Sequence, residues 1–346
     1  MSAFLSDAPC GSSKRLLIKR NRRVSFCLVF LFLLFLLLVF LTLVCGPVDL
    51  SLSELVNAVV EPAGEDVACR IVWDLRIPRV CAAVLAGASL AVSGLCLQTV
   101  FRNPLCGPFV LGISSGSSLG VALAMLVGFS FGGFGVLGAS GLGACAVTAL
   151  ILAVSARFRH NMVLLVAGLL MGYFIDALVS LLIAGAESEN LKVYVAWGMG
   201  SFSRLTFSEI WIFALSVFVG LALVVLSIRY LNASRMGDEF SRGLGIRVDV
   251  YRRLVLLGVS LLAGASTAFC GPVAFVGIAV PHLSYMLART TNHRVLIPVS
   301  ALCGAVLSLA AGLFPVEIPL NAVLSIVGVP VILSVIVRGV RRGDSL

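Results

Sequence analysis

Long apolar runs, separated by short charged or turn-rich breaks, dominate the hydropathy pattern of this chain. A helix needs about 20 apolar residues to cross the hydrocarbon core of a bilayer. The pattern predicts an all-α polytopic membrane protein, with a single transmembrane domain over 24–338 between short tails at 1–23 and 339–346. About ten spans are expected, over 24–46, 77–98, 109–128, 134–156, 161–184, 209–229, 254–270, 272–288, 295–313 and 319–338.

Composition points to the same class of protein. Apolar residues make up 60% of the chain and charged residues 12%, whereas soluble domains have roughly 45–50% and about 25%. A mean hydropathy of +1.11 leaves too little polar surface for a water-facing globule. A soluble enzyme, a disordered chain, a collagen and a secreted disulfide scaffold are therefore excluded. The ten cysteines include no C-x₂-C pair, so neither a cysteine metal site nor a disulfide framework is expected.

The net charge of +9 reports membrane topology, because the positive residues are unevenly distributed. If the N-terminus is cytoplasmic, all but five of the 25 lysines and arginines fall in inside segments. The five outside are Arg70, Arg76, Arg79, Lys192 and Arg204. The positive-inside rule thus predicts that both termini are cytoplasmic. The expected partner of this chain is the lipid bilayer, and nucleic acid is not expected.

An internal repeat is the most informative feature of the sequence. The string at 85–89, L-A-G-A-S, recurs at 262–266, and Pro104 matches Pro281 at the same offset. Under the topology above, the two copies cross the membrane in opposite directions, in repeat halves of about 76–184 and 253–338. Inverted repeats recur in transporters, because two related halves can exchange inward-open and outward-open states. The repeat therefore favours transport over a membrane enzyme or an anchor.

Candidate chemistry within the chain is sparse. None of the three lysines follows a glycine, so the phosphate-binding loop G-x-x-x-x-G-K-[ST] is absent and the chain is not expected to be an ATPase. The histidines lack the close spacing of a zinc pair, and no cofactor or metal is predicted. Asp176 is the one clear acid within a span. An intramembrane carboxylate is a functional hypothesis by default, because it needs a water-filled cavity or a hydrogen-bonding neighbour.

Small residues and a mixed loop suggest two kinds of contact. Gly112, Gly116 and Gly120 lie four residues apart and predict close helix packing. The inside segment 230–253 mixes charges with Phe240 and Leu244, which suits short surface helices offered to a partner, although a solvated basic loop is the alternative. Gly243 and Gly245 are expected to permit a backbone turn there that a Cβ would hinder.

Several strings resemble one transport family. The segments R-I-P-R, G-A-S-L-A-V-S-G, R-N-P-L, L-G-I-S-S-G, G-D-E-F-S-R-G-L-G, G-P-V-A-F-V-G-I-A-V-P-H, T-N-H-R-V-L-I-P, E-I-P-L and V-G-V-P begin at 76, 87, 102, 111, 237, 271, 291, 317 and 327. In this order and spacing, they resemble the permease subunits of FecCD-type ABC importers, a family that carries iron-siderophores, haem or cobalamin. Two departures stand out: Asn321 replaces the usual glycine, and 304–317 is several residues short.

This resemblance implies an ATP-driven importer of the bacterial inner membrane, acting by alternating access. The permease would pair with a second permease, identical or homologous, and with an extracytoplasmic binding protein. ATP hydrolysis would occur in two separate cytoplasmic ATPase subunits docked on 230–253. The implied coupling residues are Gly237, Asp238, Glu239, Leu244 and Gly245. Arg76 and Arg79 would form a basic pair at the outer rim that seats the binding protein. Candidates for the substrate pathway are Gln98, Asn103, Asp176 and His282.

An ion-coupled secondary transporter is the alternative reading, since such proteins also use inverted repeats. It would be expected to hold several charged or coordinating groups near the middle of the membrane, where only Asp176 qualifies. A non-transporting scaffold or enzyme would leave both the repeat and the family strings unexplained.

Overall fold

Helices account for all regular secondary structure in the computed structural model, which describes residues 10–46, 48, 50–60, 66–128, 135–158, 161–315 and 318–341. The ends of the two expected tails, 1–9 and 342–346, lie outside these ranges, as does Glu317. The first half contains α1 (Cys10–Val44), α2 (Leu52–Val60), α3 (Val67–Arg70), a π-helical stretch (Ile71–Arg76), α4 (Ile77–Phe101), a 3₁₀ turn (Pro108–Leu111), α5 (Ile113–Leu126), α6 (Gly135–Arg157), α7 (Asn161–Ala184) and α8 (Ser188–Gly198).

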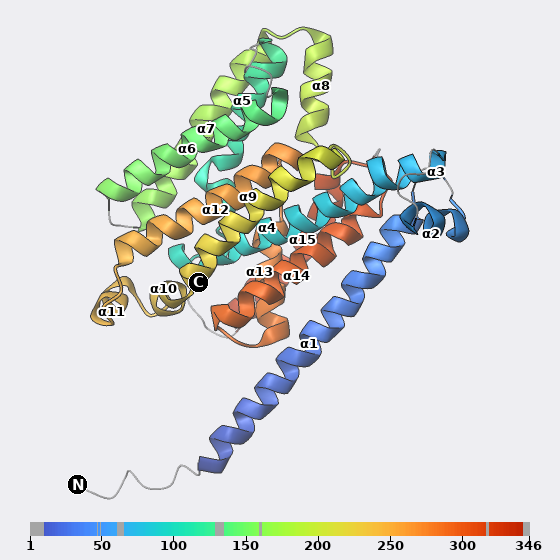
Figure 1. Ribbon diagram of the computed structural model, residues 1–346. Helices are drawn as coiled ribbons and strands as arrows, with labels where there is room; N and C mark the ends of the chain where they lie inside the picture. Colours follow the sequence, from blue (N-terminus) through green and yellow to red (C-terminus); the bar gives the residue numbers. More distant parts are fainter. Residues whose placement is uncertain are drawn as a thin grey trace, which may run out of the picture.

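The second half opens with a 3₁₀ turn (Phe207–Glu209), which is capped by Thr206 and Glu209. It continues with α9 (Ile210–Leu226), α10 (Ile228–Ser234), α11 (Asp238–Gly243), α12 (Val248–Cys270), α13 (Val276–Ala288), α14 (His293–Gly312) and α15 (Leu320–Arg341). Figure 1 shows α4, α12 and α14 running through the middle of the bundle, with α1 along one side.

Seven helices within the described ranges are long and apolar enough to cross a membrane, so the all-α polytopic class is confirmed. Three more expected spans correspond to shorter apolar helices, Ile113–Leu126, Val276–Ala288 and Leu320–Ser334. The expected span 272–288 is wrong at its start. Gly271 has a φ of +75° and Phe275 a φ of +66°, so the chain leaves the helix after α12 and re-enters it only at Val276. The count of ten spans stays a prediction.

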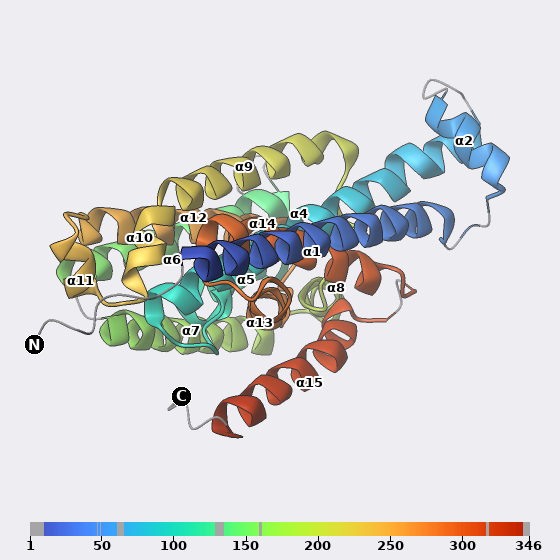
Figure 2. The ribbon, with the colours of Figure 1, turned by 90° about the horizontal axis from the view of Figure 1, so that it is seen from below.

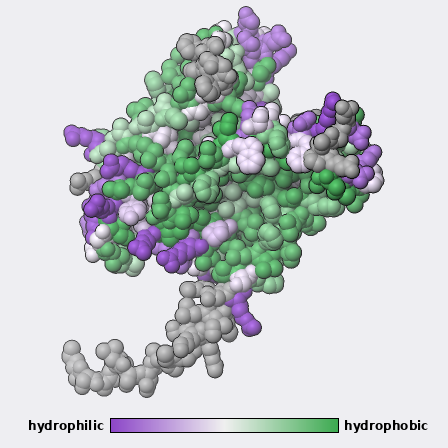
Figure 3. Space-filling model, viewed as in Figure 1, coloured by the Kyte–Doolittle hydropathy of each residue, from purple (hydrophilic) through white to green (hydrophobic). Residues whose placement is uncertain are grey.

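Burial separates central helices from peripheral ones. Within their most apolar windows, the spans containing α4 and α12 are 72% buried and α14 is 61% buried, against 22–28% for α1, α6, α7 and α9. The peripheral helices therefore present most of their surface outward. Figure 3 shows the result, a broad hydrophobic surface with hydrophilic residues gathered towards its edges.

Glycines bring the central helices into backbone contact. A Cβ added to Gly94 of α4 would lie 1.6 Å from the carbonyl oxygen of Gly277, and one added to Gly87 would lie 2.3 Å from that of Gly304. The predicted packing of the small residues in α5 is confirmed, since a Cβ on Gly120 would lie 2.0 Å from the Ala139 carbonyl oxygen of α6. Close approach of this kind increases van der Waals contact where the hydrophobic effect between helices is weak.

The bundle has two distinct ends. Figure 2 shows α10 and α11 at one end and α2 at the other. Arg102, which follows the last turn of α4, and Arg252, in the second turn of α12, both contact Asp238. The two helices that carry the repeated strings therefore run in opposite directions. The inverted repeat itself stays a prediction.

Candidate coupling site

The segment that the sequence assigns to coupling contains two short helices, α10 and α11. Gly237 has a φ of +124° and precedes α11, and Gly245 has a φ of +76° and follows it. Side chains with a Cβ rarely adopt these values, so both glycines are required by the path of the chain. The expected turn is confirmed at Gly245 and is wrong for Gly243, which is the last residue of α11 and has no positive φ.

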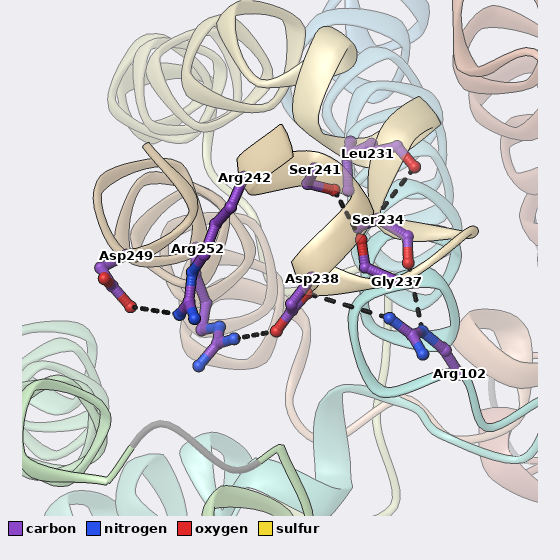
Figure 4. Close-up of polar contacts among 9 residues, drawn as sticks. All are labelled: Arg102, Leu231, Ser234, Gly237, Asp238, Ser241, Arg242, Asp249 and Arg252. Carbon is purple, nitrogen blue, oxygen red and sulfur yellow. Dashed lines mark hydrogen bonds and ion pairs between the residues drawn. The ribbon is translucent and has the colours of Figure 1, made fainter. Parts of the chain in front are cut away.

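Asp238 joins three elements at this end of the bundle (Figure 4). Its carboxylate forms an ion pair with Arg252, whose side chain is 2% exposed in α12. The other carboxylate oxygen lies 4.0 Å from Nη2 of Arg102. Arg102 also donates from Nε to the carbonyl oxygen of Ser234 in α10, over 3.1 Å. We call Arg102, Asp238 and Arg252 the Asp238 clamp, because they tie α11 to the end of α4 and the start of α12.

The backbone at Arg102 directs this contact. Arg102 has a φ of +50°, which ends α4 in a left-handed conformation. Such a residue commonly stops a helix, although an arginine there is strained relative to a glycine. Because α4 ends here, the guanidinium can turn towards α10 and α11, as Figure 4 shows.

A second contact joins α10 to α12. The rings of Tyr230 and Tyr251 stack with centroids 6.4 Å apart, and Tyr230 is fully buried. Burial raises the pKa of the Tyr230 hydroxyl, and the nearby negative charge of Asp238 raises it further. The base of the coupling segment is therefore packed as part of the protein interior.

A buried histidine links the same segment to the central helices. His293, the first residue of α14, is fully buried. Its Nδ1 lies 2.8 Å from Oδ1 of Asn232 in α10, and its Nε2 lies 2.9 Å from Oγ1 of Thr99 in α4. The backbone nitrogen of His293 donates to the same Asn232 oxygen over 2.9 Å. Sequence reasoning missed this link, because its three side chains are far apart in the chain.

Three apolar side chains of the coupling segment are exposed at the surface of the protein. Met236, Phe240 and Leu244 are 71%, 45% and 60% exposed. Phe240 lies in α11 and Leu244 directly follows that helix, and Glu239 is also exposed. We call Met236, Phe240 and Leu244 the coupling patch. Among the predicted coupling residues, Leu244 and Glu239 are thus available to a partner, whereas Asp238 faces inward.

Arg76, the first member of the predicted outer basic pair, has a different environment from the one expected. Arg76 is 5% exposed, and its guanidinium donates to the carbonyl oxygens of Leu43 and Val44 at the end of α1 and of Val48 beyond it. The expected exposure at the rim is wrong for Arg76, because helix C-terminal carbonyls without intrahelical partners attract a positive donor. Its role in docking stays a prediction.

Arg79 makes a similar contact at the end of another helix. Its Nη2 donates to the carbonyl oxygens of Gly312 and Phe314, over 2.6 and 3.1 Å. These carbonyls close the C-terminal end of α14. Arg79 is half-buried, so part of its side chain is still accessible at this end of the bundle. Docking by Arg79 also stays a prediction.

Two of the predicted pathway residues, Gln98 and His282, belong to one packing contact. Gln98 of α4 donates to the carbonyl oxygen of Ile278 in α13 over 3.2 Å. Nε2 of His282 lies 2.9 Å from the Pro104 carbonyl oxygen, and Asn103 accepts from the backbone nitrogen of Leu105 over 2.9 Å. The structure therefore brings Gln98 and His282 to the interface between α13 and the end of α4. Their role in a pathway stays a prediction.

Asp176 lies apart from these residues, exposed on α7. Among the described residues, no group of three or more His, Cys, Asp or Glu side chains could hold a metal ion.

Asn321, the departure from the family pattern, connects two distant segments. Its Oδ1 accepts from the backbone nitrogen of Ala274 over 2.9 Å, and its Nδ2 donates to the Pro272 carbonyl oxygen over 2.8 Å. Both partners belong to the non-helical stretch between α12 and α13. A glycine could not make these bonds, so Asn321 fixes the start of α15 against that stretch.

Comparison with known proteins identifies one family. The model of the FecCD transport family matches residues 33–338. An ABC transporter permease protein of Bacillus subtilis (strain 168), YvrB, is 34% identical over 288 residues, which cover 80% of this chain and 81% of YvrB. The vitamin B12 import system permease protein BtuC of Klebsiella pneumoniae is 32% identical over 297 residues, covering 82% of this chain and 88% of BtuC.

Solved structures agree with this result. A metal-chelate type ABC transporter in an inward-facing conformation superposes with a TM-score of 0.79 and 30% identity, over 90% of this chain and 98% of the other. PsaBC from Streptococcus pneumoniae, in complex with a Fab, superposes with a TM-score of 0.53 over 74% of this chain and 89% of the other. At 15% identity, that second likeness shows the fold alone.

Proposed function

This chain belongs to the FecCD transport family and is an ABC importer permease, and from this premise we propose that it moves a metal chelate inward by alternating access. The cargo we propose is an iron-siderophore, haem or cobalamin. The import of vitamin B12 by BtuC and the metal-chelate transporter among the structural relatives support this range. The relatives are transport permeases and not enzymes.

The topology we propose has ten spans, seven of them long and three short. Both termini, α10 and α11 face the cytoplasm of a bacterial cell, and α2 faces outward. The concentration of arginines in 229–253 supports this orientation through the positive-inside rule. The opposite directions of α4 and α12 support the inverted repeat that we propose.

The exposed coupling patch is the observation that supports an ATPase subunit as the cytoplasmic partner. Exposed apolar side chains at a water-facing end of a membrane protein favour a protein partner. We assign this partner as a cytoplasmic ATPase subunit, one for each of two permeases in the assembly. The Asp238 clamp and His293 would transmit movement of the patch to α4, α12 and α14, because a packed and charge-paired contact moves as one body.

The opposite end of the bundle would receive the substrate-binding protein. The half-buried Arg79 is the accessible member of the basic pair, and Arg76 would hold the end of α1 in place. Charges at the rim of an interface act mainly on the rate of association. The family assignment supports this ATP-driven system over the ion-coupled alternative.

Uptake by cells tests the cargo. A strain lacking the gene should lose accumulation of one labelled chelate among a ferric hydroxamate, a ferric catecholate, haem and cobalamin, and the intact gene should restore it. Depleting cellular ATP should abolish the restored uptake. Normal accumulation of all four chelates in the deletion strain would contradict the proposed function.

A further inference from the structure

Helix α7 exposes a polar stripe within an apolar span. The window Met162–Ala184 has a hydropathy of 2.3 and is only 28% buried. Tyr173, Asp176 and Ser180 are all exposed, and their spacing of three and four residues places them on one face of the helix. Asp176 lies about 12 Å along the helix axis from Ala184. It is therefore well within the depth of a hydrocarbon core about 30 Å thick.

This face cannot be covered by lipid tails alone. A carboxylate in contact with acyl chains is costly, and intramembrane acids face a bundle interior or a water-filled cavity. Helix α9 provides the contrast within the same protein. Its most exposed large side chains are Trp211, Phe218, Leu226 and Leu215, all of them apolar or aromatic, as expected for a lipid-facing helix.

Neighbouring helices extend the polar character of this region. Figure 1 shows α5, α7 and α8 grouped at one side of the molecule. Tyr194 of α8 is close enough to Asp176 to sense its charge, and Ser118 of α5 lowers the pKa of the same tyrosine. Burial raises the pKa of this tyrosine, and the negative charge of Asp176 raises it further. A polar group of α8 thus lies near the exposed carboxylate of α7.

We propose that Tyr173, Asp176 and Ser180 line the water-filled route of the cargo, and that Asp176 makes this route favour neutral or cationic chelates over anionic ones. The inference rests on the proposed function, because it takes the cargo to be a metal chelate. In water, a carboxylate at neutral pH is an anion. Low-dielectric walls around a narrow aqueous route focus its field. A ferric tris-hydroxamate, which is neutral, would therefore pass more readily than a ferric tris-catecholate, which is an anion.

Thiol labelling tests this assignment without cargo or ATP, so its outcome is independent of the uptake experiment. A single cysteine is introduced as Ser180→Cys in the full-length chain with its native cysteines replaced, in proteoliposomes. Methanethiosulfonate reagents of opposite charge are then applied, one with a trimethylammonium group and one with a sulfonate. Leu215→Cys on the apolar face of α9 is the matched control.

We expect Ser180→Cys to react with both reagents, faster with the cation, and Leu215→Cys to react with neither. Adding Asp176→Asn should lower the ratio of cation to anion rates about fivefold. That is the effect of one unit charge some 6 Å away in screened water. Equal inertness of Ser180→Cys and Leu215→Cys would overturn the aqueous route. A rate ratio unchanged by Asp176→Asn would overturn the charge preference.

Discussion

Asp238 at the start of α11 forms an ion pair with Arg252 of α12, whose guanidinium side chain is almost completely buried. The coupling segment is thereby attached to a central helix by a charge that has little access to water. Removing one partner from a buried pair leaves the other charge uncompensated, and this costs more than the pair contributes. The link between the coupling segment and the bundle should therefore be sensitive to single substitutions.

Asp238→Ala should lower the free energy of unfolding by about 3 kcal/mol, the low end for a broken buried pair, because Asp238 itself is 23% exposed. Chemical unfolding of the purified permease in detergent measures this change. Asp249→Ala is the control, since its pair with Arg242 spans 3.8 Å and both side chains are about half exposed. It should change stability by less than about 1 kcal/mol. Equal losses of unfolding free energy in Asp238→Ala and Asp249→Ala would contradict the stabilising role of the Asp238 clamp.

Alanine at the two glycines of the coupling segment should act in opposite directions. Gly245 has a φ of +76°, so Gly245→Ala should destabilise the protein by about 1–2 kcal/mol. Gly243 is helical, and a Cβ there would meet nothing within 4 Å. Gly243→Ala should therefore be neutral or stabilise by up to about 1 kcal/mol. Thermal unfolding of both variants measures these changes in stability. A Gly245→Ala variant more stable than the unsubstituted protein would contradict the requirement for glycine at this turn.

Asn321→Ala should lower the free energy of unfolding by about 1–3 kcal/mol, because it leaves the Ala274 nitrogen and the Pro272 oxygen without this partner. Ser325→Ala is the control in the same helix, where the hydroxyl bonds, among the described residues, only to the carbonyl oxygen of Asn321. It should change stability by less than about 0.5 kcal/mol. A loss of stability in Ser325→Ala as large as that in Asn321→Ala would count against this role.

Arg76→Gln should reduce stability without altering the salt dependence of binding-protein association. The reason is that Arg76 is buried against the end of α1, and hydrogen bonds to a charged group contribute about 1.5–3 kcal/mol. Arg79→Gln, at a half-buried position, should weaken that salt dependence. Binding kinetics at several ionic strengths separate the two, and a reduced salt dependence in Arg76→Gln would show that Arg76 docks directly.

The apolar runs were sufficient to predict most of the helices. Long stretches such as 161–184 and 209–229 carry a strong local signal, because apolar length alone determines whether a helix can span a bilayer. The break between Cys270 and Val276 was less readable. Its boundaries depend on the φ values of Gly271 and Phe275 and on the hydrogen bonds from Asn321, and none of these has a local hydropathy signature.

The contacts of the candidate site were harder to predict than the segment itself. The string at 237–245 selected the segment that we propose for coupling, but nothing in it reveals that Asp238 turns inward to meet Arg102 and Arg252. Those partners come from α4 and α12, far away in the sequence. Arg76 illustrates the same difficulty, because its burial depends on the end of α1 and not on its own neighbours.

Site-specific photocrosslinking from position 244 tests the central claim most directly. A photoreactive amino acid replaces Leu244 in the coupling patch, and in a control chain it replaces Val56 of α2, which is exposed at the opposite end. After illumination of intact membranes, mass spectrometry identifies the adduct. We predict that position 244 captures a subunit containing a phosphate-binding loop and that position 56 does not. An ATPase adduct from position 56 alone, or none from position 244 while uptake is active, would contradict the account.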